Sequence, residues 1–169
     1  MMKKLLASCL IVLLSLSLAA CGFTPMRGAQ NRQALSVGVS VDASPKDEDG
    51  RELEKALEDR LNLQGLPSHP AYKLSVVLTS ALGGIGVARD GTVSRFNVTL
   101  TSNYVLTRLA DDKIIQRGEI RHVSSFNNQT NQYFSTYISE KDSIKRGIAE
   151  LSELYRQRIG ALLLKQQPV

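Results

Sequence analysis

Hydrophobic and polar residues alternate along four stretches of this 169-residue chain, at about residues 35–41, 72–78, 93–109 and 114–124. Successive side chains of a strand point to opposite faces, so a period of two predicts a β-strand with one buried face. The expected buried positions are Leu35, Val37, Val39 and Val41, then Tyr72, Leu74, Val76 and Leu78, then Phe96, Val98, Leu100, Tyr104 and Leu106, and finally Ile114, Gly118 and Ile120.

Two other stretches repeat apolar residues every three or four positions, which is typical of amphipathic helices. The first contains Leu53, Leu57 and Leu61 and is ended by Gly65 and Pro67. The second is expected to begin at Ser139, with Asp142 three residues later, and to run for about 25 residues. Its apolar face holds Ile144, Ile148, Leu151, Tyr155, Ile159 and Leu162, and its expected solvent face holds Lys145, Glu150, Glu153, Arg156 and Gln157.

The order of these elements is strand, helix, strand, strand, strand, helix. Because a sheet buries one face by packing against helices, this order predicts an α/β (α+β) fold. We expect a two-layer sandwich in which two helices cover one face of a four-stranded mixed sheet, within a single domain at residues 34–165. Residues 110–113 are a predicted turn that joins the last two strands as a hairpin. Ile115 falls on the opposite face from Ile114.

A glycine-rich segment separates the second and third strands and is predicted to be a loop. It contains Gly83, Gly84, Gly86 and Gly91. Two interpretations stay open: a flexible connection, or a contact loop in which glycine admits a partner's backbone and Ile85 and Val87 supply apolar contact. The segment 84–89 begins like a nucleotide-binding G-x-G-x-x-G motif, but it lacks the last glycine and leads into a strand, which argues against nucleotide binding.

The first 20 residues have the parts of a secretory signal. A basic start with Lys3 and Lys4 precedes the apolar run Leu5–Leu18, which is shorter than the roughly 20 residues that span a bilayer. The sequence Leu-Ala-Ala-Cys at residues 18–21 resembles the lipobox of bacterial lipoproteins, which implies cleavage before Cys21 and acylation of that residue. Residues 21–33 would then be a lipidated tether, and the alternative is an uncleaved apolar anchor. Gly22, where an inner-membrane lipoprotein often has Asp, favours the outer membrane.

The composition after residue 20 excludes several classes of protein. Nineteen basic and 16 acidic residues remain, for a formal net charge of +3, which is too small for a dedicated nucleic-acid binder. The two cysteines are Cys9, inside the predicted signal, and Cys21, the predicted lipid site. No thiol is then left for a disulfide, a metal or catalysis, so packing or a partner must hold the domain together.

Candidate catalytic groups are sparse, and we predict that the protein is not an enzyme and uses no cofactor or metal. The two histidines, His69 and His122, carry no nucleophile or metal-ligand motif around them. Residues 47–49 (Asp-Glu-Asp) are best interpreted as a solvated helix entry, where carboxylates favour the positive end of the helix dipole. The alternative is an envelope hydrolase that uses His69 or His122 as a base.

Basic residues accompany the third and fourth strands. Odd-numbered positions from Arg95 to Asn103 are polar and lie opposite the predicted buried face. This face is either an ordinary solvated surface or a surface for an anionic ligand, since arginine pairs with phosphate through two hydrogen bonds. The basic residues are Arg89, Arg95, Arg108, Lys113, Arg117 and Arg121.

Several segments together resemble the LptE family of lipopolysaccharide-assembly lipoproteins, in its alphaproteobacterial form. Residues 18–26 resemble the family's opening, Cys-Gly-Phe-x-Pro followed by Leu or Met, with Arg27-Gly28 as a small departure. Residues 95–106 resemble its long strand, and residues 118–125 and 133–142 with the terminal helix resemble its C-terminal half. The resemblance covers nearly the whole chain after residue 20.

This resemblance implies an outer-membrane lipoprotein that faces the periplasm and is held by its lipid. Such proteins plug the lumen of the LptD barrel, help it fold, and assist insertion of lipopolysaccharide into the outer leaflet; they are also thought to bind lipopolysaccharide. Arg89 and Arg95 are our candidates for contact with its phosphates, although no family motif assigns them. The alternative is an auxiliary lipoprotein of an ABC-type envelope lipid transporter.

Overall fold

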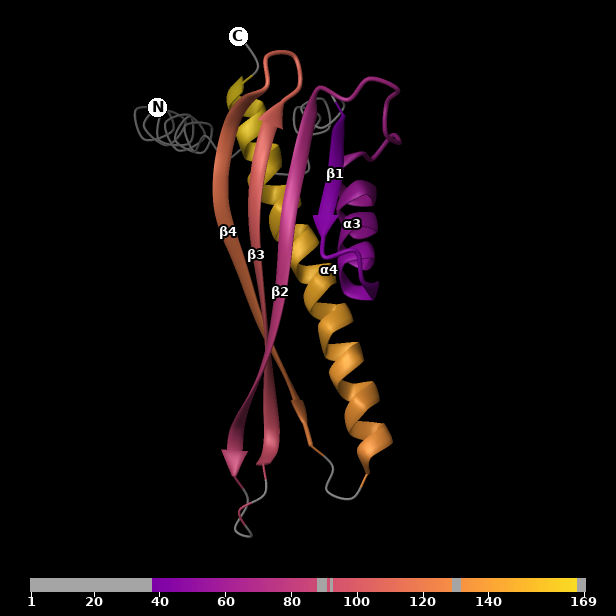
Figure 1. Ribbon diagram of the computed structural model, residues 1–169, viewed down its shortest axis with the longest axis vertical. Helices are drawn as coiled ribbons and strands as arrows, with labels where there is room; N and C mark the ends of the chain where they lie inside the picture. The colour runs from indigo at the N-terminus through magenta and orange to yellow at the C-terminus, as the bar shows by residue number, and fades with distance from the viewer. Residues whose placement is uncertain (1–37, 88–90, 92, 129–131, 167–169) are drawn as a thin grey trace, which may run out of the picture.

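A computed structural model describes residues 38–87, 91, 93–128 and 132–166. The elements are β1 (Val39–Ser44), α3 (Glu48–Leu61), β2 (Tyr72–Val87), β3 (Val93–Arg108), β4 (Lys113–Asn127) and α4 (Tyr133–Gln166). The four strands form one open sheet in the order β1-β2-β3-β4, with β1 parallel to β2 and the other pairs antiparallel. Both helices lie on the same face of this elongated sheet (Figure 1), which confirms the predicted architecture.

The hydrophobic core lies between the sheet and the two helices. Even-numbered positions of β2 and β3 face the helices, as the period-two pattern predicted. The fully buried Tyr155 of α4 packs edge-on against Tyr104, with 5.3 Å between ring centroids, and its hydroxyl lies 2.5 Å from the Ser102 hydroxyl. A buried hydroxyl is costly unless it is hydrogen-bonded, so this pair lets two polar groups sit in an apolar layer. The largest fully buried aliphatic side chains are Leu53, Leu57, Leu61, Leu74, Leu100, Leu106, Ile148, Leu151, Ile159 and Leu163.

Both ends of α3 are fixed by polar side chains. Asp47 is the N-cap, and its carboxylate accepts a 2.9 Å hydrogen bond from the Gly50 amide. A side chain at Gly50 would place its Cβ 1.8 Å from the Pro45 carbonyl oxygen, so only glycine fits this close approach. At the other end, buried Asn62 accepts from the Val39 amide and donates to the Val39 carbonyl, both at 2.9 Å. Asn62 thereby ties the end of α3 to the start of β1.

The glycine-rich segment was wrongly predicted as a loop from Gly83 onward. Gly83, Gly84 and Gly86 belong to β2, which pairs with β3 as far as Val87. Register shifts on either side of Gly86 mark an irregularity, a position where glycine is common in strands. Backbone pairing along the whole of β3 outweighs the poor strand propensity of glycine. Only Gly91, at a φ of 82°, belongs to the connection, as expected.

The first and last strands also differ from the prediction. Of the predicted strand at 35–41, residues 35–37 lie outside the described residues, and β1 continues to Ser44. In β4 a register shift pairs Ile114 with Thr107 and Gln116 with Leu106, so Ile115 is an extra residue opposite this pair. Ile115 therefore packs against the core while Ile114 is exposed, the reverse of the expectation.

The long C-terminal helix begins at Tyr133, not at Ser139 as predicted. The apolar residues at 133, 134, 137 and 138 already have helical spacing, but the capping pattern of Ser139 and Asp142 indicated a later start. No residue of α4 before Ser143 is buried. The first turns of α4 thus extend past α3 along the lower part of the sheet (Figure 1).

A polar seam joins the two helices where the sequence predicted a solvent face. Glu153 of α4 accepts from Arg156 at 2.5 Å and from Arg60 of α3 at 2.8 Å. Hydrogen bonding from Arg156, supported by Gln157 and Arg60, lowers the pKa of Glu153 to about 2. The prediction was wrong for these residues because helical periodicity alone does not reveal a neighbouring helix. Further along the seam, Lys141 pairs with Glu48 at 3.0 Å.

Candidate ligand-binding surface at the distal end

The two ends of the molecule carry different side chains. We define the distal end as the one where β2 and β3 are connected, β4 ends and α4 begins, and the proximal end as the one where β1 begins and α4 ends. At the distal end, Asn128 joins the elements, since it donates to the Val93 carbonyl at 2.7 Å and accepts from Thr136 of α4 at 3.1 Å. The distal end is therefore a structured surface that β3, β4 and α4 build together.

Arg95 is the predicted ligand-binding residue that the structure describes, and it lies at this distal end. Its side chain is exposed and donates to the Ser125 hydroxyl of β4, from Nε at 3.2 Å and from Nη2 at 2.6 Å. A single neutral acceptor leaves guanidinium donors for a further anion. The other two predicted site residues, Arg89 and the lipidation site Cys21, lie outside the described residues.

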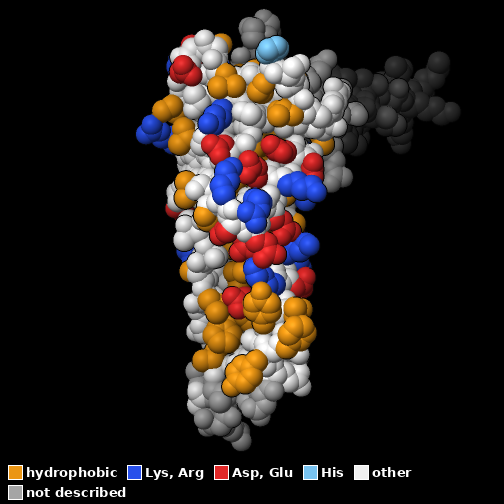
Figure 2. All heavy atoms as spheres, turned by 45° about the vertical axis from the view of Figure 1, so that its right-hand side comes forward, with side chains coloured by type: hydrophobic (Ala, Val, Ile, Leu, Met, Phe, Trp, Pro, Cys, Tyr) orange, Lys and Arg blue, Asp and Glu red, His pale blue; other side chains and the backbone are white. Residues whose placement is uncertain are grey.

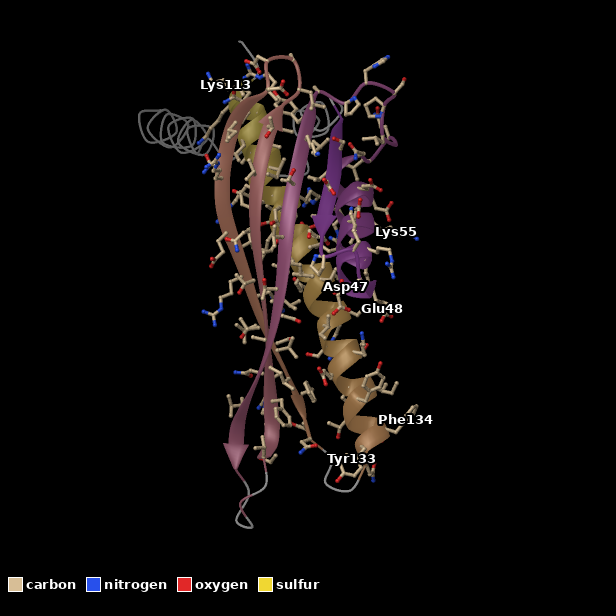
Figure 3. All side chains as sticks on the ribbon, in the orientation of Figure 1. Asp47, Glu48, Lys55, Lys113, Tyr133 and Phe134 are labelled. Atoms are coloured by element: carbon tan, nitrogen blue, oxygen red, sulfur yellow. The ribbon has the colours of Figure 1, made fainter. Side chains whose placement is uncertain are left out.

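An exposed apolar surface accompanies Arg95 at the distal end. We call Tyr133, Phe134, Tyr137 and Ile138 of α4 the distal apolar patch; Tyr133 and Phe134 are 89% and 77% exposed. Figure 2 shows hydrophobic side chains gathered on this part of the molecule, and Figure 3 shows Phe134 projecting outward from the helix. Leu82 and Ile85, both about half exposed, lie near the same end on β2. Sequence reasoning missed this patch because it placed residues 133–138 before the helix.

Beneath this surface the sheet is well packed. Phe96 of β3 and Phe126 of β4 are cross-strand partners, and their rings stack with 5.7 Å between centroids. Aromatic pairs of this kind add to the stability of neighbouring strands. This pair stabilises β3 and β4 at the distal end, so a ligand or partner could bind there without first ordering these two strands.

The remaining predicted basic residues do not gather around Arg95. Arg108 is 13 residues further along β3, roughly 43 Å away at the rise of an extended strand, and contacts Asp111 and Gln166 at the proximal end. Lys113 lies near Arg108, whereas Arg117 and Arg121 lie midway along β4. The sequence pattern placed these residues on neighbouring strands but could not show that they are spread along the whole length of the sheet.

The helix-free face of the sheet is polar, with Asn97, Thr99, Thr101 and Asn103 of β3 along its middle. Asn103 also borders a shallow hollow of about 520 Å³ on this face, together with Val77, Val105 and Arg117. The hollow is open and its surface is mainly apolar, so it offers no convergent set of hydrogen-bonding groups. We therefore place the candidate surface at the distal end, where Arg95 lies, and not along the middle of this face.

The two histidines lie on separate elements. His69 is exposed in the segment between α3 and β2, and half-buried His122 packs beside Gly147 of α4. Among residues 38–87, 91, 93–128 and 132–166, no group of three or more histidine, cysteine or acidic side chains could hold a metal ion. Within the same ranges, no helix is long and apolar enough to cross a membrane.

Comparison with known proteins relates this architecture to bacterial lipoproteins. The sequence matches no protein-family model and no curated protein. A crystal structure of a putative lipoprotein from Caulobacter crescentus CB15 superposes with a TM-score of 0.63 at 20% identity, over 83% of this chain and 100% of that one. This chain and the Caulobacter crescentus lipoprotein therefore share the same fold.

Two further solved lipoproteins share this fold. Rare lipoprotein B from Shewanella oneidensis gives a TM-score of 0.56 at 12% identity, over 73% of this chain and 93% of that one. A minor lipoprotein from Acinetobacter baumannii gives 0.59 at 19% identity, over 73% and 90% of the two chains. Sequences this different share an architecture, so the chemistry of the surface must be argued from this chain's own residues.

Proposed function

We propose that this protein is a lipoprotein of lipopolysaccharide assembly, processed before Cys21 and held at the outer membrane by lipid on that residue. In this proposal the domain faces the periplasm and plugs the lumen of an LptD-type barrel, aiding the assembly of the barrel and the passage of lipopolysaccharide. The observation that carries the proposal is the fold, which this chain shares with several lipoproteins over 90% or more of their length. The Leu-Ala-Ala-Cys sequence at residues 18–21 supports it independently.

The distal end has the chemistry that a phosphorylated, acylated lipid requires. Arg95 supplies charge-assisted hydrogen bonds for phosphate, and the distal apolar patch supplies a surface for acyl chains. Arg89 is close to Arg95 in sequence and is part of the same proposal. Neither group resembles a catalytic constellation, so the proposed mechanism is binding and positioning without covalent chemistry.

The proposal is tested by affinity purification of the tagged protein from detergent-solubilised outer membranes, followed by mass spectrometry. Recovery of a large outer-membrane barrel in near-equal amount supports the assembly role. Recovery of an ABC transporter would replace it with the transporter-linked alternative, and the absence of any stoichiometric partner would contradict both. The variant Cys21→Ser is the matched control, because it keeps the domain and removes the acylation site; it should lose metabolic labelling with palmitate and membrane retention.

A further inference from the structure

A groove lies far from the distal end, between β4 and the C-terminal half of α4. It encloses about 570 Å³, and a smaller hollow of about 230 Å³ continues it toward Gln116, with Arg158 and Leu162 lining both. Ile120, Leu154 and Leu162 supply apolar surface along the groove. Strand β4 is the last strand of the sheet, so the groove is bounded on one side by a strand edge and on the other by a helix.

The charge around this groove is unbalanced. Arg121, Arg158 and Lys165 line it, Arg117 lines its continuation, and Glu119 is the one carboxylate among the lining residues. In the described part of the chain, no salt bridge joins any of these four basic residues to a carboxylate. By contrast, basic residues in the seam between α3 and α4 form salt bridges with acidic residues of the other helix. An acidic partner is therefore complementary to this groove and not to the seam.

The backbone of β4 is oriented to accept another strand. The Glu119 carbonyl accepts from Arg158 of α4 at 2.9 Å, and the Arg117 carbonyl accepts from the Gln116 side chain at 2.9 Å. Both carbonyls thus point away from β3, and in an antiparallel ladder the amide of the same residue points the same way. The outward amides of this segment are those of Arg117, Glu119, Arg121 and Val123. The exposed side chains of Gln116 and Arg158 cover part of this edge, and a charged partner could displace them.

We propose that this groove docks an extended, acidic segment of a partner protein, which adds to β4 as an antiparallel fifth strand. The peptide's alternate side chains would enter the apolar groove on the helix side. Its other side chains would face Arg117, Glu119 and Arg121, whose side chains share the helix-free face. Directly opposed side chains on neighbouring strands interact most strongly. The best-matched peptide therefore has one acidic residue opposite Arg117 and another, four positions away, opposite Arg121. The residue midway between them, opposite Glu119, is neutral. This inference rests on β4 and α4 and does not depend on the proposed function.

A bound lipid explains these observations less well than a peptide. A lipid phosphate would satisfy the arginines, but it cannot use the row of outward amides and carbonyls along β4. From Gln116 to Arg121 the edge spans roughly 17 Å, the length of five to six extended residues. The groove therefore matches a short strand in length, in charge and in hydrogen-bonding pattern.

The test uses the full-length protein in detergent and a synthetic peptide of about nine residues. The peptide alternates valine with polar residues and carries two glutamates four positions apart, with threonine between them. Binding is measured by fluorescence anisotropy, and backbone protection by hydrogen exchange. We expect the peptide to slow exchange at the amides of Glu119 and Arg121, while those of Ile120 and His122, which point toward β3, change little. A matched peptide with lysine for each glutamate should not bind.

Two sets of controls separate strand addition from simple charge attraction. N-methylation of the glutamates blocks the amides that would face β4 and should abolish binding, whereas N-methylation of the flanking valines should be tolerated. Arg121→Glu should weaken binding by about tenfold or more. Lys55→Glu makes the same charge change on the outer side of α3 (Figure 3) and should change binding by less than about twofold.

Three outcomes would overturn the proposal. One is equal loss of affinity in Arg121→Glu and Lys55→Glu, which would show non-specific attraction. Another is binding that N-methylation of the glutamates does not affect, because strand addition requires those amides. The third is that vesicles of phosphatidylglycerol bind through Arg121 while the peptide does not, which would make the groove a lipid site.

Discussion

The buried hydroxyl pair between Ser102 and Tyr155 allows a quantitative test of how this core is held together. Both side chains are fully buried, and their oxygens are 2.5 Å apart. Burial raises the pKa of Tyr155, so its hydroxyl stays protonated at any ordinary pH. Tyr155→Phe leaves the Ser102 hydroxyl buried without this partner, and Ser102→Ala does the same to the tyrosine. Each change should lower the free energy of unfolding by about 1–3 kcal/mol, because an unsatisfied buried group carries its full desolvation cost.

The double variant decides whether this reasoning is correct. With both hydroxyls removed, no polar group of the pair is left unsatisfied, so the double variant should lose less stability than the two single variants together. We expect a coupling of about 1–2 kcal/mol between Ser102 and Tyr155. Urea unfolding followed by far-UV circular dichroism measures all four proteins, and an unchanged m-value shows that the comparison is valid. Strict additivity of the two changes would refute the proposed hydrogen bond.

Three other predictions concern separate parts of the molecule. Asn62→Asp should lower the free energy of unfolding by about 1–3 kcal/mol in urea, because a carboxylate cannot donate to the Val39 carbonyl; an unchanged midpoint would contradict this. Glu153 has a folded pKa of about 2 against 4.5, so its contribution is present above pH 4.5 and is lost as the pH falls toward 2. Glu153→Gln should therefore flatten the acid limb of a melting-temperature profile, and an unaltered limb would exclude this role. Tyr133→Ser with Phe134→Ser should leave unfolding within about 0.5 kcal/mol of the wild type yet weaken lipopolysaccharide binding; intact binding would remove the patch from the proposed site.

The sequence predicted the layers of this fold better than its boundaries. Burial alternates so regularly in β3 that Val98, Leu100 and Leu106 could be assigned to the core directly. Gly84 was misplaced because strand propensity is local, whereas the pairing of Gly84 with Phe96 depends on a partner 12 residues away. The position of Ile115 depends on a register shift, and no single strand's pattern reveals one.

The candidate surface could be predicted only in part. Arg95 was identified from its type and strand position, but its place at the distal end depends on the lengths of β2 and β3. The aromatic residues Tyr133 and Phe134 were visible in the sequence, yet their exposure follows from a helix that extends past its neighbours. The groove beside Arg121 could not be predicted at all, because it depends on how α4 packs beside the β4 edge of the sheet.

The short first strand has a consequence for the behaviour of the isolated protein. β1 pairs with β2 only from Tyr72 to Val77, and within the described residues no strand pairs with the same edge of β2 from Leu78 to Val87. That segment contains no charged residue and no proline, which are the residues that usually keep exposed edges from joining one another. Concentrated protein without a partner is therefore expected to associate slowly through intermolecular β-structure. A lysine in place of Thr79 should delay this aggregation, as measured by light scattering, because it restores a charge to the edge.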